Sequence, residues 1–132
     1  MTPCIFCQIV SKEIFSHIIY EDNDFLAFID IHPISPGHTL VIPKRHYRWV
    51  WDVPNTNEYF EITKKIALAQ RRAFETDAIS IKIVGEEITN AHIWVFPNPY
   101  FLQQKKEDVI KRSFKEEIND FEGNKKKIID NL

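Results

Sequence analysis

The sequence predicts one α+β domain with a largely antiparallel sheet of about five strands and helices on one side. Three observations support this fold class. The chain has 132 residues, of which 44% are hydrophobic, enough for a single core. Short apolar runs rich in Ile, Val and Phe alternate with turn residues, and two longer segments show helical periodicity. We expect the domain to span residues 1–121, with a lysine-rich tail at 122–132.

The N-terminal half is expected to contain a short helix and three strands. Residues 5–10 are predicted to form the helix. The runs 17–21 and 25–30 flank a turn of Asp22, Asn23 and Asp24, which indicates a hairpin. A loop with two prolines follows, and then residues 39–43 form an apolar strand that we expect to be buried on both faces.

The C-terminal half is expected to contain two helices around two strands. Residues 54–57 open a long helix over 58–75, which has apolar residues at Ile62, Ile66, Ala69 and Ala73. Strands are predicted at 79–84 and 91–96. A last amphipathic helix is predicted at 105–121, with an apolar face of Ile110, Phe114, Ile118 and Phe121. Gly123 is expected to end it, leaving residues 124–132 frayed.

The charge balance argues against several classes of partner. The net charge of −2 provides no general attraction to nucleic acid or to anionic membranes. The apolar runs are shorter than the ~18 residues of a membrane span, and the N-terminus lacks the pattern of a signal peptide. We therefore expect a cytoplasmic protein without nucleic-acid or membrane partners, in which any affinity for phosphate comes from a local site.

The last strand carries the residue best suited to chemistry. Because side chains alternate across a strand, Ala91, Ile93 and Val95 share an apolar face. The other face presents His92 between Asn90 and Trp94. Histidine acts as a nucleophile or a general base near neutral pH. A lone histidine on a strand is also compatible with a purely structural role, and the flanking sequence decides between the two.

The flanking sequence resembles the histidine-triad (HIT) family. The resemblance covers residues 4–97 and is carried by Cys4-Ile-Phe-Cys7, by Phe25-Leu-Ala-Phe-Ile-Asp30, and by the block Pro36-Gly-His-Thr-Leu-Val-Ile-Pro-Lys44. The segment Gly85-Glu-Glu-Ile-Thr-Asn-Ala-His-Ile-Trp-Val-Phe-Pro97 is similar to the family's signature strand in its short-loop bacterial form. The resemblance implies a HIT-like fold, purine-nucleotide binding and a homodimer.

The resemblance also implies a mechanism, with two departures. The central triad histidine of the family attacks the α-phosphorus to give a nucleotidyl-histidine, and His92 matches it. The outer histidines are replaced by Asn90 and Trp94. An amide still forms hydrogen bonds, but an indole donates only its N–H and cannot change protonation state. We therefore expect nucleotide binding with weak hydrolase or nucleotidyl-transferase activity.

Other family positions imply a nucleotide pocket. Asp30 matches the acidic residue that holds the ribose hydroxyls, a task suited to a carboxylate. An aspartate at this place also fits a local backbone cap. The apolar wall around the base corresponds to Phe6, Ile9, Phe28 and Ile31, whose pattern equally fits an ordinary core.

The Cys4-x-x-Cys7 pair points to a metal site or to reduced thiols that pack the first helix. In the resemblance, both cysteines and His46 match ligands of a structural zinc, whose fourth ligand is the histidine replaced by Asn90. Three competing hypotheses result: a weak enzyme using His92, a nucleotide-binding protein without turnover, and an interaction protein with a degenerate site.

Overall fold

Five antiparallel strands form a single sheet in the computed structural model, which describes residues 4–106 and 114–132. The strand order is β1-β2-β3-β5-β4. The bounds are β1 (Ile18–Glu21), β2 (Phe25–Ile29), β3 (Thr39–Pro43), β4 (Ile79–Ile83) and β5 (Ile93–Pro97). The α+β class and the five strands are confirmed, and each strand lies within two residues of its predicted position.

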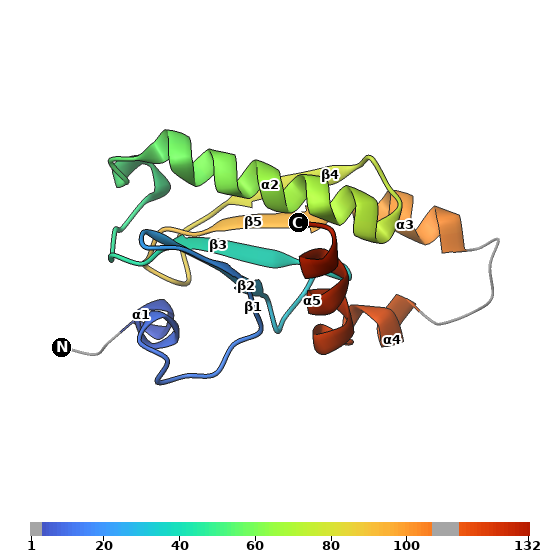
Figure 1. Ribbon diagram of the computed structural model, residues 1–132, viewed down its shortest axis with the longest axis horizontal. Helices are drawn as coiled ribbons and strands as arrows, with labels where there is room; N and C mark the ends of the chain where they lie inside the picture. The colour runs from blue at the N-terminus through green and yellow to red at the C-terminus, as the bar shows by residue number, and fades with distance from the viewer. Residues whose placement is uncertain (1–3, 107–113) are drawn as a thin grey trace.

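Helices lie on both faces of the sheet, which corrects the expectation that they would share one side. The long helix α2 (Thr56–Phe74) follows the 3₁₀ turn η1 (Val50–Asp52) and crosses one face (Figure 1). The short helix α1 (Ile5–Val10) lies against the opposite face, where Phe6 and Ile9 pack on Phe28 and Leu40. The sheet is therefore the middle layer of the molecule.

The central strands are apolar on both faces because both faces are covered. Every residue of β2 and β3 is buried, as expected for the run 39–43. One core cluster lies under α2 and includes Val41, Ile93 and Val95, while Trp94 packs with the cluster under α1. The predicted alternation of β5 is thus confirmed, and His92 and Trp94 lie on the α1 side of the sheet.

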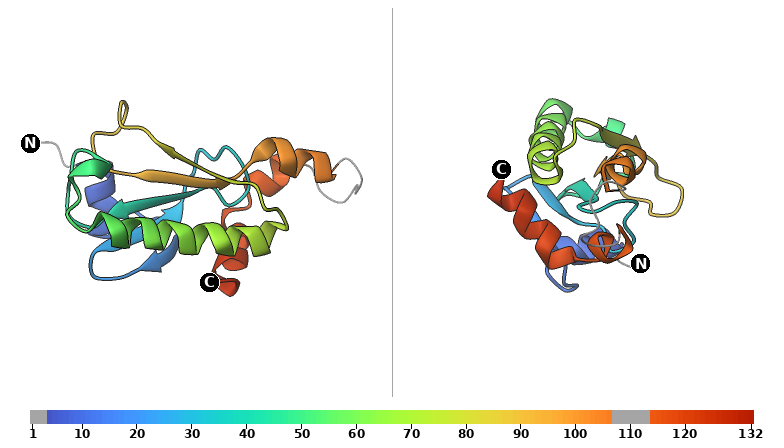
Figure 2. Two further views of the ribbon diagram at one scale, coloured as in Figure 1. Left: turned by 90° about the horizontal axis from the view of Figure 1, so that it is seen from above. Right: turned by 90° about the vertical axis from the view of Figure 1, so that its right-hand side faces the viewer.

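The C-terminal region differs most from the expectation. The predicted helix over 105–121 is instead α3 (Pro99–Lys106) and α4 (Phe114–Ile118), with residues 107–113, including Ile110, outside the described residues. The segment expected to be frayed is the helix α5 (Phe121–Asp130). It packs beside α2 and β1 (Figure 2) and buries Asn124 and Ile128.

Gly123 lies in the first turn of α5 and does not end a helix. The Asp120 carboxylate caps α5 by accepting a hydrogen bond from the Gly123 N–H at 3.1 Å. A Cβ on Gly123 would meet this carboxylate at 2.3 Å, so the glycine leaves room for the cap. The prediction that Gly123 ends a helix is therefore wrong, because its N–H is needed for the cap at the start of α5.

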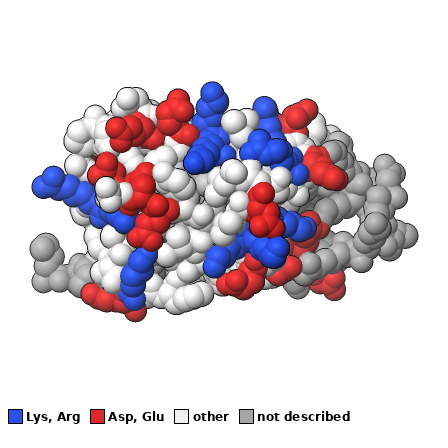
Figure 3. Space-filling model, viewed as in Figure 1, with Lys and Arg blue, Asp and Glu red and all other residues white. Residues whose placement is uncertain are grey.

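Surface charges of both signs are interspersed. On the face shown in Figure 3, Lys and Arg side chains lie among Asp and Glu side chains and do not gather into one basic area. Among the described residues, each helix is too short or too polar to cross a membrane.

Candidate functional site

His92 immediately precedes β5 and is buried against α1. His92 is only 4% exposed. Its ring contacts the ring of Phe6 edge-on, with the two centroids 5.2 Å apart. Its Nδ1 lies 2.7 Å from the backbone oxygen of Asn90. Because a carbonyl only accepts, Nδ1 carries the proton and Nε2 keeps its lone pair.

Burial also keeps His92 neutral. Desolvation lowers the pKa of His92 below its ordinary value of 6.5, and the positive charge of Arg48 lowers it further. The hydrogen bond to Asn90 and the carboxylates of Asp30 and Glu86 act in the opposite direction without reversing the shift. The Nε2 atom is therefore unprotonated at neutral pH and keeps a free electron pair.

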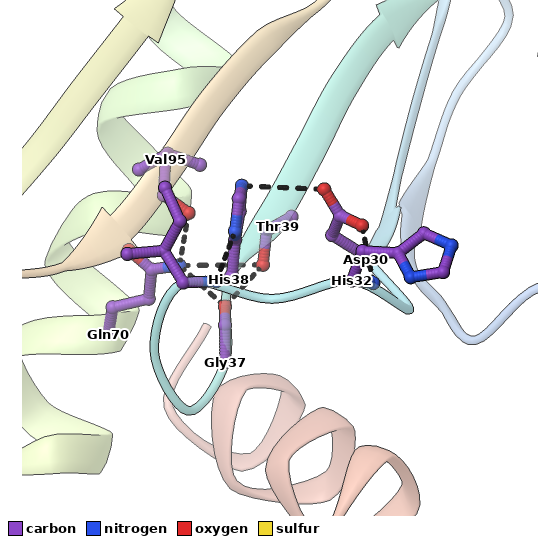
Figure 4. A network of polar contacts seen from close by, with 8 residues as sticks. Asp30, His32, Gly37, His38, Thr39, Gln70 and Val95 are labelled. Carbon is purple, nitrogen blue, oxygen red and sulfur yellow. Dashed lines mark hydrogen bonds and ion pairs between the residues drawn. The ribbon is translucent and has the colours of Figure 1, made fainter. Parts of the chain in front are cut away.

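Asp30 follows β2 and faces His38, as Figure 4 shows. Its Oδ1 accepts a hydrogen bond from the His32 N–H at 2.8 Å. Asp30 therefore caps the local backbone, as the sequence allowed. Its Oδ2 lies 3.6 Å from His38 Nε2, beyond a good hydrogen bond. One carboxylate oxygen is thus held by the loop, and the other retains acceptor capacity.

His38 is a site residue whose partners the sequence did not reveal. It is fully buried, and its Nδ1 accepts a hydrogen bond from the Ile34 N–H at 3.0 Å. The proton of the neutral ring therefore sits on Nε2, which faces Asp30 and has no hydrogen-bond partner among the described residues. Desolvation lowers the pKa of His38 to about 4, partly offset by Asp30.

Trp94 lies on the same face of β5 as His92. Its side chain is half-buried, its ring centroid is 5.2 Å from that of His38, and Lys82 Nζ lies 5.4 Å from its ring. The indole therefore forms an aromatic side of the site where the family's third histidine would stand.

Of the four residues expected to surround the base, three are buried and one is exposed. Phe6, Ile9 and Phe28 belong to one buried cluster, and the rings of Phe6 and Phe28 meet edge-on with centroids 5.8 Å apart. Ile31 is 59% exposed, at the rim. The cluster continues toward His92 through Phe6, so apolar surface borders the His92 ring.

The predicted zinc ligands come together beside this site. One ligand atom from each of Cys4, Cys7 and His46 lies within 4.8 Å of the others, and Cys7 Sγ is 3.3 Å from His46 Nδ1. The Asn90 side chain points to the same place, with Nδ2 3.5 Å from Cys4 Sγ. Asn90 is thus directed at the cysteines, although we expected it to contact the nucleotide.

The ligand atoms of Cys4, Cys7 and His46 lie close enough together to hold a zinc ion. Tetrahedral zinc with sulfur ligands at ~2.3 Å separates its ligand atoms by roughly 3.8 Å, comparable with the spacing here. Asn90 Oδ1 is buried and lacks a hydrogen-bond partner among the described residues. Because amide oxygen and nitrogen exchange places by a flip, Oδ1 is able to face the metal position as a fourth ligand.

The model of the HIT domain family matches residues 11–99, and the chain belongs to this family. A relative from Saccharomyces cerevisiae, adenosine 5'-monophosphoramidase HNT1, is 33% identical over 99 residues, covering 71% of this chain and 61% of the relative. The family therefore includes an enzyme that acts on a nucleotide.

Solved structures agree with the fold. A Hit-like protein involved in cell-cycle regulation from Bartonella henselae has a TM-score of 0.78 and 34% identity, covering 98% of this chain and 96% of that one. A Zn-bound histidine triad family protein from Mycobacterium smegmatis has a TM-score of 0.77 and 29% identity, covering 97% and 91%. The HIT-like fold predicted from the sequence is confirmed.

Proposed function

We propose that this protein binds purine nucleotides and slowly hydrolyses or transfers a nucleotidyl group through His92. The observation that carries the proposal is the hydrogen bond from His92 Nδ1 to the Asn90 oxygen, which directs the free electron pair to Nε2. Nε2 attacks the α-phosphorus, the N–P bond forms, and the leaving group departs with its bonding pair. Water then attacks phosphorus, breaks the N–P bond and releases the nucleoside monophosphate.

The residues around His92 provide the binding part of this function. Asp30 Oδ2 accepts hydrogen bonds from the ribose hydroxyls, while the His32 N–H orients the carboxylate by holding Oδ1. The base packs against the apolar surface of Phe6, Ile9 and Phe28, with Ile31 at the rim. HNT1, whose name gives an adenosine 5'-monophosphate derivative as substrate, supports a nucleotide ligand.

Turnover is slow because the residues next to His92 cannot transfer a proton to the leaving group. The Asn90 amide is engaged with Cys4, and the Trp94 indole cannot protonate a leaving group. Losing general acid–base help costs roughly 10²–10⁴ in rate. Trp94 is also the observation that favours the second candidate function, a nucleotide-binding protein without turnover.

Intact mass spectrometry tests the mechanism. After incubation with adenosine 5'-phosphoramidate, the unmodified protein should carry one adenylyl group, and His92→Ala should carry none while its affinity for AMP stays within a few fold. Trp94→His should hydrolyse the adduct faster, and Asn90→His with Trp94→His faster still. An adduct on His92→Ala would refute the mechanism, and an adduct-free protein that binds AMP would favour the second function.

We also propose a structural zinc ion held by Cys4, Cys7 and His46, with Asn90 Oδ1 or water in the fourth position. Its ligands would tie α1, which carries Phe6, to the segment after β3. The Zn-bound protein from M. smegmatis supports this proposal. The purified protein should contain about one zinc per chain, and a chelator should lower its Tm. Cys7→Ser should abolish both effects, whereas unchanged stability on adding zinc to metal-free protein would contradict the proposal.

A further inference from the structure

Two thiols lie side by side at the start of α1. Cys4 and Cys7 are free cysteines, both partly exposed, and their Sγ atoms lie within 4.8 Å of one another. Cys4 is the N-cap of the helix, and its Sγ accepts a hydrogen bond from the Cys7 N–H at 3.2 Å. The Cys4 side chain is therefore folded over the first turn, toward Cys7. To form a disulfide, the two sulfur atoms need only approach to ~2.05 Å within this turn.

The surroundings of each sulfur fit one step of thiol–disulfide exchange. Cys4 Sγ faces two N–H donors, the Cys7 backbone and the Asn90 amide at 3.5 Å, and such donors stabilise a thiolate. Burial and the neighbouring Cys4 raise the pKa of Cys7 to about 11, so Cys7 keeps its proton until Cys4 has reacted. Cys7 Sγ also lies 3.3 Å from His46 Nδ1, and a neutral imidazole nitrogen accepts a thiol proton. Cys4 is thus placed to react first and Cys7 to follow.

Cys4 is connected to His92 through a single residue. Cys4 Sγ contacts the Asn90 side chain, and the backbone oxygen of Asn90 accepts a hydrogen bond from His92 Nδ1 at 2.7 Å. The helix that begins after Cys4 also carries Phe6, whose ring contacts the ring of His92. A disulfide draws Cys4 Sγ toward Cys7 and lengthens its contact with Asn90. The oxidation state of the two thiols therefore acts on the surroundings of His92.

We propose that Cys4 and Cys7 form a reversible disulfide that weakens nucleotide binding at His92, with a small-molecule disulfide such as glutathione disulfide as the oxidant. The Cys4 thiolate attacks one sulfur of the oxidant, forms a mixed disulfide and releases one thiolate. Cys7 then loses its proton and attacks the Cys4 sulfur, which breaks the mixed disulfide and releases the second thiolate. The two protons lost by the cysteines go to the released thiolates, so two protein thiols are oxidised and one disulfide is reduced. The effect on nucleotide binding rests on the proposed function, whereas the disulfide itself does not.

The disulfide and the proposed zinc ion exclude each other. Zinc binds cysteine sulfur as the thiolate, and a disulfide sulfur has no such charge to offer. Oxidation of zinc-loaded protein should therefore release one zinc for each disulfide formed, and a chromogenic chelator measures this release. Disulfide formation with the zinc still bound would overturn the pairing of Cys4 with Cys7.

Intact mass spectrometry with glutathione disulfide tests the chemistry. Chelator-treated protein should lose the mass of two hydrogen atoms and recover it with dithiothreitol. Cys7→Ser should instead keep one glutathione on Cys4, since it lacks the thiol that resolves the mixed disulfide, and Cys4→Ser should carry much less. Two free thiols after prolonged oxidation, or a disulfide between two chains, would overturn the proposal. Equal adducts on the two variants would overturn the order of attack.

Nuclear magnetic resonance and calorimetry test the connection to the site. When chelator-treated protein is oxidised, the side-chain amide of Asn90 and the ring of His92 should change chemical shift. AMP affinity should fall by about twofold to tenfold, the effect of losing one hydrogen bond. The buried amide of Asn124, which belongs to α5 and donates to the Glu117 oxygen, is the internal control and should keep its chemical shift.

A variant without either thiol controls for the oxidant. Cys4→Ser combined with Cys7→Ser should have the same AMP affinity before and after exposure to glutathione disulfide. Unchanged resonances and unchanged AMP affinity in the oxidised unmodified protein would overturn the connection to His92. If the reduced protein binds no AMP, the proposed function fails, and the mass spectra and resonances still decide whether the disulfide forms and reaches His92.

Discussion

His38 shows how the interior of the fold fixes the charge of a single residue. The ring is fully buried, and the Ile34 N–H occupies its Nδ1 acceptor. A proton added there would break that hydrogen bond and place a positive charge among the rings of Trp94 and Phe96. The folded protein therefore excludes the charged form of His38.

This exclusion predicts acid sensitivity. The unfolded chain protonates His38 near pH 6.5, whereas the folded chain does so only near pH 4, so protons favour unfolding between these values. His38 should remove about 3 kcal/mol from the free energy of unfolding over this interval. Urea titrations from pH 7 to pH 4 should show a smaller loss for His38→Asn, whose amide oxygen still accepts from Ile34.

An exposed histidine serves as the control for this measurement. His32→Asn should keep the full dependence of the unmodified protein on pH. If His38→Asn and the unmodified protein lose the same free energy on acidification, then His38 is not held neutral by the fold.

At the residue scale, the sequence predicted the identity of the central side chains better than their direction. The convergence of Cys4, Cys7 and His46 agrees with the metal ligands that the resemblance implied. The turn of Asn90 toward Cys4 depends on a contact between positions 86 residues apart, which strand alternation cannot reveal. Arg48 near Gly85 is likewise a tertiary contact between two loops.

At the scale of elements, the periodicity of apolar residues predicted the strands and helices correctly wherever a helix packs on the sheet. The buried positions of α2 repeat every three or four residues, and they include Ile62, Ile66, Ala69 and Phe74. The C-terminal region was mispredicted because α5 buries only a narrow stripe, Asn124 and Ile128, and exposes Lys126 and Lys127. Such a composition also fits a solvated tail, and only packing against α2 and β1 distinguishes the two.

The packing of α5 leads to a stability prediction. Ile128 is fully buried in the main core, while the next residue, Ile129, is 40% exposed. Ile128→Ala should lower the free energy of unfolding by about 2–5 kcal/mol, since it leaves a cavity near Phe74 and Gly37. Ile129→Ala should cost less than about 1 kcal/mol. Similar small losses for both variants in urea denaturation would show that residues 121–130 form a loosely attached segment.

At the scale of the whole molecule, the sheet has two unlike edges. α5 packs beside β1, whereas β4 is half-exposed, with Ile81 51% exposed. An exposed edge strand is a template for pairing with another chain. The aromatic residue Tyr59 belongs to the core of its own chain and donates to the Val41 oxygen at 2.7 Å. Trp49 and Trp51 remain exposed.

These features predict a homodimer that pairs through β4. Sedimentation at micromolar concentration should give twice the chain mass of 15.7 kDa. Ile81→Lys should shift the protein toward monomer by placing a charge in the contact. Phe15→Lys, which changes an exposed residue before β1, should leave the assembly unchanged. A monomeric unmodified protein would contradict the prediction.

Gln70 links two backbone segments that carry residues of the candidate site. From α2, its Nε2 donates to the Gly37 oxygen at 2.9 Å and to the Val95 oxygen at 3.0 Å (Figure 4). One amide thus fixes the spacing between the backbone beside His38 and the backbone beside Trp94. A substitution at position 70 should therefore alter the spacing of these two backbone segments, although Gln70 lies on the α2 side of the sheet. The shape of the proposed nucleotide site thus depends on a buried residue that does not line it.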